Sequence, residues 1–197
     1  MLGKTRTVMI ALALGGSLVG TTAFAANEYV APMKEFAEKS VKSWMADKTI
    51  VDAVKAQNKE NANISQADID RLDKQWRSET KAAQRPFIDG IMERPISRKL
   101  QDIRNEGRGL ITEIFVMDNK GLNVGQSDVT SDYWQGDEDK WQKTYLAGAD
   151  AMFIDEVEFD ESTQTFQSQL SMPVVDPASG EVIGAVTFGI DVNALLQ

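Results

Sequence analysis

Five apolar-rich runs in the second half of the chain, each bounded by turn residues, constrain the fold most strongly. They are residues 110–117, 122–127, 152–159, 165–174 and 182–192. The turn DNKG (118–121) separates the first two runs, and DPASG (176–180) separates the last two, with Pro and Gly where tight turns favour them. Residues 160–164 are polar and form another short connection. The pattern predicts five strands, of which the last three are antiparallel neighbours.

The preceding residues, about 30–109, have the spacing of amphipathic helices. The apolar residues that recur at helical intervals near the start are Met33, Phe36, Ala37, Val41, Trp44 and Met45. They predict a helix of about four turns. Asp47 and Ser65 are expected to cap two further helices, and Trp76 to lie in the core. Pro95 is expected to break a short helix, and Ser97 to cap the next one.

The N-terminus has the composition of an export signal. Lys4 and Arg6 precede an apolar, small-residue stretch (8–19), and AFA at 23–25 matches an A-x-A cleavage site. We therefore expect cleavage after Ala25, a periplasmic location, and one domain whose helical part is 26–109 and whose sheet part is 110–197. The alternative is an uncleaved membrane anchor, although the stretch is short for a membrane span.

The charge balance is strongly acidic. The whole chain has 21 basic and 30 acidic residues, a net charge of −9. Without the two basic residues of segment 1–25, 19 basic residues remain against the 30 acids, a net charge of −11. This balance argues against nucleic acid or anionic lipid as a partner. It favours a cationic or zwitterionic ligand, although solubility alone also explains it.

Two residue types are missing. The chain contains no Cys and no His, which excludes disulfides, thiol chemistry, a Ser-His-Asp triad, the usual zinc sites and His-ligated haem. Enzyme chemistry is left with carboxylates, Lys and Tyr, and no spacing singles out a carboxylate pair for glycoside hydrolysis. We therefore expect neither an enzyme nor a cofactor.

Three motifs resemble those of a single Cache domain, the PAS-like extracytoplasmic sensor fold of bacterial chemoreceptors and sensor kinases. They are the DNKG turn (118–121), SDVTSDYW (127–134) and PVVDPASGEVIGAV (173–186). The resemblance covers about residues 30–197 and is greatest for stand-alone periplasmic sensor proteins. It implies an α+β fold with a five-stranded antiparallel sheet and a long N-terminal helix. Receptor Cache domains continue into a membrane helix, whereas this chain ends at Gln197, so we expect any signal to pass through another protein.

The first candidate site follows from this resemblance, which places the aromatic segment after the second strand in the wall of the ligand pocket. The residues concerned are Ser127, Asp128, Asp132, Tyr133, Trp134 and Trp141. Tyr and Trp offer a rigid apolar or cation–π surface, and Asp and Ser can orient a ligand by hydrogen bonds. The alternative is that Ser and Asp cap turns and that the Trp side chains pack on the sheet.

Polar side chains within strands form the second candidate set. Asp155 alternates with apolar neighbours, and Gln167 and Gln169 share one strand face. They either contact a ligand or line a solvent-facing sheet surface. The acidic run DED (137–139) could bind Ca²⁺, but its spacing lacks the alternate-residue ligand pattern and suits the first turn of a helix better. No metal site is predicted.

The sequence thus predicts a soluble periplasmic sensor that binds a small organic molecule and signals through a membrane kinase, chemoreceptor or cyclase. No Arg follows Arg108, so a carboxylate ligand lacks a bidentate Arg in the strand half. An amine or a neutral ligand is preferred for this reason. The alternative is an interaction protein that forms a homodimer or docks through its N-terminal helix without a ligand.

Overall fold

The computed structural model describes residues 28–160 and 165–197. The predicted signal segment and its cleavage after Ala25 lie outside the described residues. No helix in the described part of the chain is long and apolar enough to cross a membrane.

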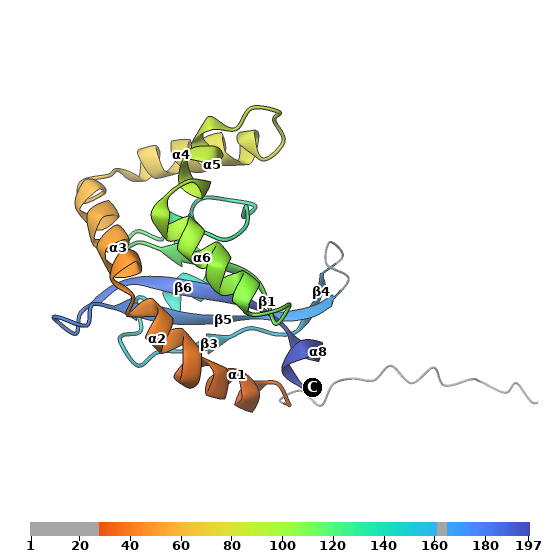
Figure 1. Ribbon diagram of the computed structural model, residues 1–197. Coiled ribbons are helices and arrows are strands. Elements are labelled where there is room, and N and C mark those ends of the chain that lie inside the picture. The colour runs from red at the N-terminus through yellow and green to blue at the C-terminus, as the bar shows by residue number, and fades with distance from the viewer. Residues whose placement is uncertain (1–27, 161–164) are drawn as a thin grey trace, which may run out of the picture.

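An antiparallel sheet forms the centre of the molecule (Figure 1). Its strands are β1 (Ile111–Met117), β2 (Asn123–Gln126), β3 (Phe153–Ile154), β4 (Glu158–Asp160), β5 (Thr165–Val175) and β6 (Val182–Asp191). They are ordered β2-β1-β6-β5-β3, and β4 also pairs with β5. The last three predicted strands are antiparallel neighbours as expected, and the α+β class is confirmed.

The third predicted strand is divided in two. Between β3 and β4, Asp155 still donates its backbone N–H to the Gln169 carbonyl oxygen at 2.9 Å. Its carboxylate, however, accepts the backbone N–H of Glu156 at 2.9 Å. Such a local bond from side chain to backbone competes with the strand ladder, and alternation of apolar residues along the sequence does not reveal it.

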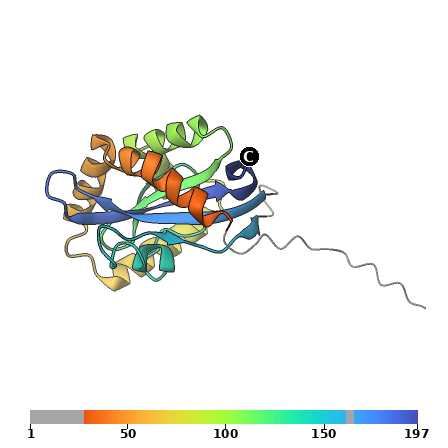
Figure 2. The same ribbon diagram turned by 90° about the horizontal axis from the view of Figure 1, so that it is seen from below.

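Most of the helices lie on one face of the sheet or beyond its β2 end, and α7 lies on the opposite face. The helices are α1 (Val30–Phe36), the π-helical turn η1 (Ala37–Val41), α2 (Lys42–Met45), α3 (Lys48–Glu60), α4 (Gln66–Glu79), α5 (Pro86–Met92), α6 (Pro95–Glu106), α7 (Asp139–Gln142) and α8 (Val192–Leu195). The first three form the predicted long N-terminal helix, which runs across the sheet (Figure 2). Asp47 caps α3 by accepting the Thr49 N–H at 2.8 Å, and Ser65 caps α4 by accepting the Asp68 N–H at 3.2 Å.

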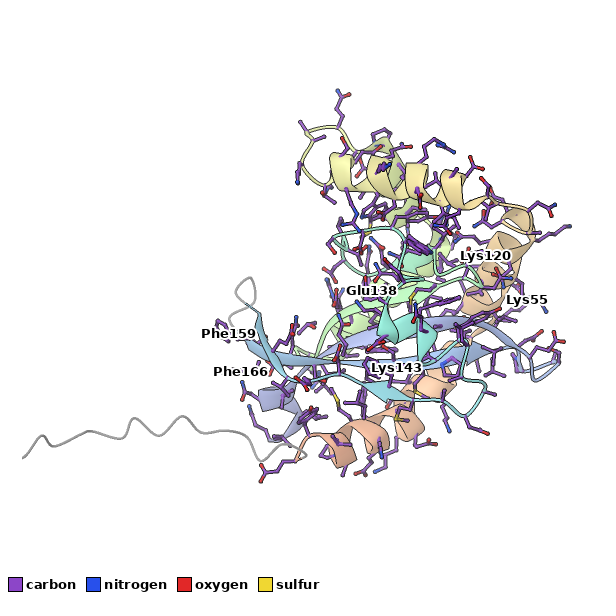
Figure 3. All side chains as sticks on the ribbon, turned by 180° about the vertical axis from the view of Figure 1, so that it is seen from behind. Lys55, Lys120, Glu138, Lys143, Phe159 and Phe166 are labelled. Atoms are coloured by element: carbon purple, nitrogen blue, oxygen red, sulfur yellow. The ribbon has the colours of Figure 1, made fainter. Side chains whose placement is uncertain are left out.

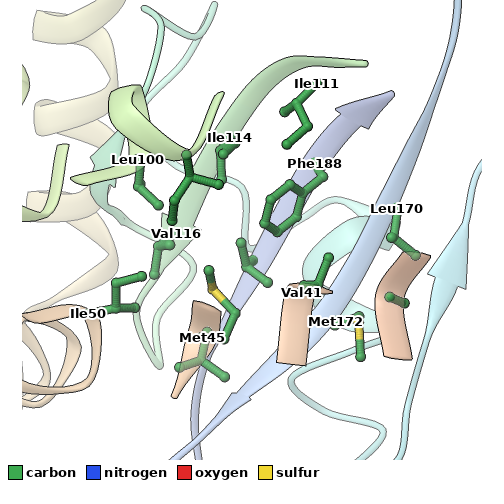
Figure 4. Close-up of a cluster of buried hydrophobic side chains, with 14 of the residues drawn as sticks. Val41, Met45, Ile50, Leu100, Ile111, Ile114, Val116, Leu170, Met172 and Phe188 are labelled. Atoms are coloured by element: carbon green, nitrogen blue, oxygen red, sulfur yellow. The ribbon is translucent and has the colours of Figure 1, made fainter. Parts of the chain in front are cut away.

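The main core lies between these helices and the sheet (Figure 4). Its fully buried side chains include Val41, Ile50, Leu100, Ile114 and Phe188. A second cluster surrounds the buried Trp76 between α4 and α5, which lie at the far end of the molecule beyond β2 (top of Figure 1). A third, smaller cluster lies on the opposite face of the sheet.

Ser97 does not cap a helix, contrary to the prediction. Helix α6 begins two residues earlier, at Pro95, which occupies its first turn. The buried Ser97 hydroxyl donates to the Ile91 carbonyl oxygen at 2.7 Å and accepts the Gln126 N–H at 3.1 Å. It therefore ties α5 and α6 to β2.

Candidate functional site

The sheet face opposite the N-terminal helix carries polar side chains from three adjacent strands. Glu113 of β1 and Gln169 of β5 are both in register with Gly189 of the central strand β6. Because Gly189 has no side chain, the Gln169 amide can cross it and donate to the Glu113 carboxylate at 3.2 Å. A Cβ atom at Gly189 would lie 2.7 Å from Cγ of Glu113. This glycine makes room for a polar surface at the middle of the sheet.

Helix α7 and the loop before it cover this polar face (Figure 3). Trp141 anchors α7, because its ring packs against Phe115 and stacks on Tyr145 with 4.9 Å between ring centroids. Its indole N–H donates to the Asp118 carbonyl oxygen at 3.0 Å. Trp141 therefore fixes the direction in which neighbouring side chains of α7 point.

Two adjoining cavities lie between the cover and the sheet. The larger, of about 290 Å³, is lined by Glu138, Asp139, Lys140, Asp155, Glu156, Glu158, Gln167, Ser168 and Gln169. The smaller, of about 130 Å³, is lined by Glu113, Phe115, Thr130, Ser131, Asp132, Gln135, Glu138, Lys140 and Gln169. Glu138, Lys140 and Gln169 line both, so the two cavities form one groove. We call it the acidic groove.

The charges in the acidic groove are unbalanced. Of the described residues that line it, seven are carboxylic acids and only Lys140 is basic. The Lys140 ammonium lies 2.7 Å from Glu138 and 5.5 Å from the centre of the Phe115 ring, with its side chain only 14% exposed. Asp139 at the rim is paired with Lys143 at 2.7 Å. The remaining negative charge favours a positively charged occupant.

Three of the residues predicted from the sequence line the acidic groove. Asp155 and Gln167 lie in the larger cavity, and Asp132 lies in the smaller one. Asp132 also forms an ion pair with Arg77 of α4 at 3.1 Å. The Gln167 amide oxygen accepts the Thr112 hydroxyl at 3.0 Å. Polar residues of the strands and of the aromatic segment therefore meet in one place.

The other five predicted residues do not line either cavity. Ser127 is buried, and its hydroxyl accepts the Ile114 N–H at 2.8 Å. Tyr133 is buried and stacked on Trp76, and this burial raises the pKa of its phenol. The Trp134 indole donates to the Lys120 carbonyl oxygen at 2.8 Å.

Asp128 and Trp141, the remaining two, also have partners within the protein. The Asp128 carboxylate forms an ion pair with Arg104 of α6, and Trp141 packs on the sheet as described above. The strand half lacks Arg after Arg108, yet Arg77 and Arg104 of the helical half supply guanidinium groups to this segment. Sequence reasoning missed these two contacts because they join residues far apart in the chain.

The acidic groove contains residues that the sequence did not single out, above all Lys140 and Gln135. No local pattern marks them, because a Lys in a short polar helix is ordinarily solvent-exposed. In the described part of the chain, no group of three or more acidic residues has a geometry that could hold a metal ion.

Comparisons with known proteins give structural matches alone. No family model and no curated protein sequence matches the chain. The sensor domain of the histidine kinase DctB of V. cholerae matches 86% of this chain and 57% of its own length, at 15% identity and a TM-score of 0.44. The match to the sensory domain of the Campylobacter jejuni chemoreceptor Tlp3 covers 84% of this chain and 66% of that domain, at 12% identity and a TM-score of 0.41.

A third match is the ligand-binding domain of the Pseudomonas aeruginosa PAO1 amino-acid chemoreceptor PctC in complex with GABA. It covers 79% of this chain and 63% of that domain, at 13% identity and a TM-score of 0.41. The chain thus spans 57 to 66% of the length of these three structures. All three are sensor, sensory or ligand-binding domains, and all are 12 to 15% identical to this chain.

Proposed function

We propose that this protein is an extracytoplasmic sensor component that binds a small organic amine in the acidic groove. The observation that carries the proposal is the charge of the groove, in which seven carboxylic acids and one basic residue line two connected cavities. An ammonium group placed there is attracted by several carboxylates and donates hydrogen bonds to their oxygens. The amide groups of Gln167 and Gln169 supply further polar contacts from the sheet.

The size of the groove limits the ligand. The larger cavity, about 290 Å³, is at the lower end of the roughly 300–1,000 Å³ usual for small-molecule sites. It suits an amine of amino-acid size rather than a peptide or an oligosaccharide. Phe115 in the smaller cavity is the one aromatic lining residue and offers a ring face to a cation.

Signalling follows if binding changes how the α7 cover sits on the sheet. A ligand shifts such an equilibrium only by its difference in affinity for the two arrangements. The amine would contact both the cover, through Glu138, and the sheet, through Asp155 and Gln169. It would therefore favour the arrangement in which the two are closest. A membrane kinase, chemoreceptor or cyclase is the proposed reader of this change.

The test is thermal unfolding of the purified protein with monoamines, diamines, amino acids, organic acids and neutral metabolites. A ligand at 100 times its dissociation constant stabilises the folded state by about 2.7 kcal/mol, which raises the melting temperature by several degrees. Asp155→Asn should abolish most of the shift, whereas Asp137→Asn, an exposed acid outside the groove, should retain it. Stabilisation by organic acids alone, or by no compound, would refute amine binding.

The alternative function, docking of a partner on the N-terminal helix, has little support because the exposed side of this helix is charged. The apolar side of this helix, with Met33, Ala37 and Val41, is already buried against the sheet. Its outer side carries the ion pairs Lys39–Glu35 and Lys42–Glu38, whose side chains are 54 to 72% exposed. Exposed pairs of this kind contribute little to association.

A further inference from the structure

A separate cavity lies between α3 and the start of α6, which are side by side in Figure 1. Its volume is about 540 Å³, and it shares no lining residue with the acidic groove. Its wall is mostly apolar, because small side chains on α3 leave a gap beside α6. The apolar lining residues are Ala53, Ala56, Pro95, Ile96 and Val124.

Arg94 is held in a fixed orientation at this cavity. One guanidinium nitrogen, Nη1, donates to the Gln57 side-chain oxygen at 2.8 Å and to the Val124 carbonyl oxygen at 2.8 Å. Gln57 is itself buried and fixed by a hydrogen bond from its amide nitrogen to Asp118 at 3.0 Å. These contacts order the arginine before any ligand arrives, which lowers the entropy lost on binding.

Among the residues that the structure describes, no carboxylate is paired with Arg94. Both of its side-chain hydrogen bonds within residues 28–160 and 165–197 are made by Nη1, so Nη2 and Nε donate to no acceptor there. These two nitrogens form the side-on fork that binds both oxygens of a carboxylate. Arg94 is half-buried and lines a cavity whose wall is mostly apolar. Its free Nε and Nη2 groups therefore favour an organic anion as the ligand.

Two acids at the rim restrict which anion fits. Asp52 pairs with Lys48, and the exposed Glu60 has no ion pair among the described residues. A second negative charge on a ligand would meet Glu60 or Asp52, whereas an apolar body would meet the Ala and Ile side chains. We propose that this cavity binds a small monocarboxylate with a compact apolar body, its carboxylate on Arg94.

The probes for this proposal are isovalerate, benzoate and valine, with succinate as the dianionic comparison. Binding to the purified full-length protein is followed by calorimetry and by shifts of backbone NMR signals. We expect saturable binding of isovalerate or benzoate, at least about tenfold tighter than that of succinate. Valine binding more tightly than isovalerate would add a contact of its ammonium group with Glu60, and would support the same site.

Three variants locate the site. Arg94→Lys keeps the charge but loses the fork, and should weaken binding at least about tenfold. Ala56→Met fills the cavity without altering the hydrogen bonds of Arg94, and should weaken binding to a similar extent. Arg98→Gln, an exposed position on the same helix outside the cavity, and Asp155→Asn in the acidic groove should change it less than about twofold.

Three results would overturn the proposal. The first is the absence of saturable binding by isovalerate, benzoate and valine. The second is binding that survives both Arg94→Lys and Ala56→Met within twofold, since the carboxylate would then lie elsewhere. The third is succinate binding as tightly as isovalerate. None of these results bears on the acidic groove, so the two proposals succeed or fail separately.

Discussion

Replacing Lys140 with Met should strengthen amine binding in the acidic groove. Among the described residues that line this groove, Lys140 alone carries a positive charge. Its ammonium is paired with Glu138 at 2.7 Å and lies 5.5 Å from the Phe115 ring centre. An incoming ammonium must share or displace these contacts. Met keeps the length and apolar stem of the side chain and removes only the charge.

The size of the effect follows from the position of the pair. Two unit charges about 4 Å apart attract by about 4 kcal/mol at an effective dielectric constant of about 20. Solvent screening and the cost of desolvation remove most of this, because Glu138 is 36% exposed. If about a third of this attraction remains, the Lys140→Met variant binds an amine more tightly by about 1.4 kcal/mol. This difference corresponds to a tenfold lower dissociation constant.

Calorimetry with propylammonium, at about 50 mM and about 500 mM salt, measures this effect. The gain should shrink at high salt, where the screening length falls to a few ångströms. Lys143→Met is the matched control, because Lys143 is 54% exposed, lines neither cavity and pairs with Asp139 at the rim. It should change affinity less than about twofold. Weaker binding in Lys140→Met would refute the reasoning, since Lys140 would then bind the ligand instead of competing with it.

Three further predictions concern the stability of the fold. Trp76→Phe should lower the free energy of unfolding in urea by about 1–3 kcal/mol. The buried Thr130 carbonyl oxygen, 2.9 Å from the Trp76 indole nitrogen, loses its donor in this variant. A loss below about 0.5 kcal/mol would contradict this. The hydrogen bond from Lys55 lowers the pKa of Asp176 below its ordinary value of 3.8. The ionised carboxylate therefore stabilises the folded state above that value, and the stabilisation is lost as the pH falls through the lowered pKa. Asp176→Asn should make unfolding between pH 5 and pH 2 less pH-dependent than in the wild type. Gly121→Ala should destabilise more than Gly180→Ala, since both have positive φ (+81° and +75°) but only Gly121 would bring a Cβ within 2.5 Å of backbone; equal melting temperatures would refute the steric argument.

Periodicity and turn chemistry predicted the elements of this fold well. Helical spacing located the N-terminal helix, and Asp47 and Ser65 cap the helices that were expected to follow them. Alternating strand residues and the two connections predicted the pairing of the last three strands. These features depend on neighbours within a few residues of one another, and such information is contained in the local sequence.

The contacts that the sequence did not reveal join distant segments. Arg77 and Arg104 pair with acids 55 and 24 residues away. Ser97 binds two partners in other elements rather than its own helix. Each follows from how α4, α5 and α6 pack beside β2. Nothing within a helical turn of these residues distinguishes them from ordinary surface or capping positions.

The aromatic side chains of residues 133–141 were expected to line the ligand pocket, but in the structure they pack above the groove instead. The indole N–H groups of Trp134 and Trp141 both donate to backbone carbonyl oxygens of the turn between β1 and β2. Tyr133 is buried against Trp76. These rings hold the loop and α7 over the sheet, and the groove below them is lined largely by polar side chains. Loss of the Trp141 ring should therefore impair amine binding by releasing the cover, even though the ring itself does not line either cavity.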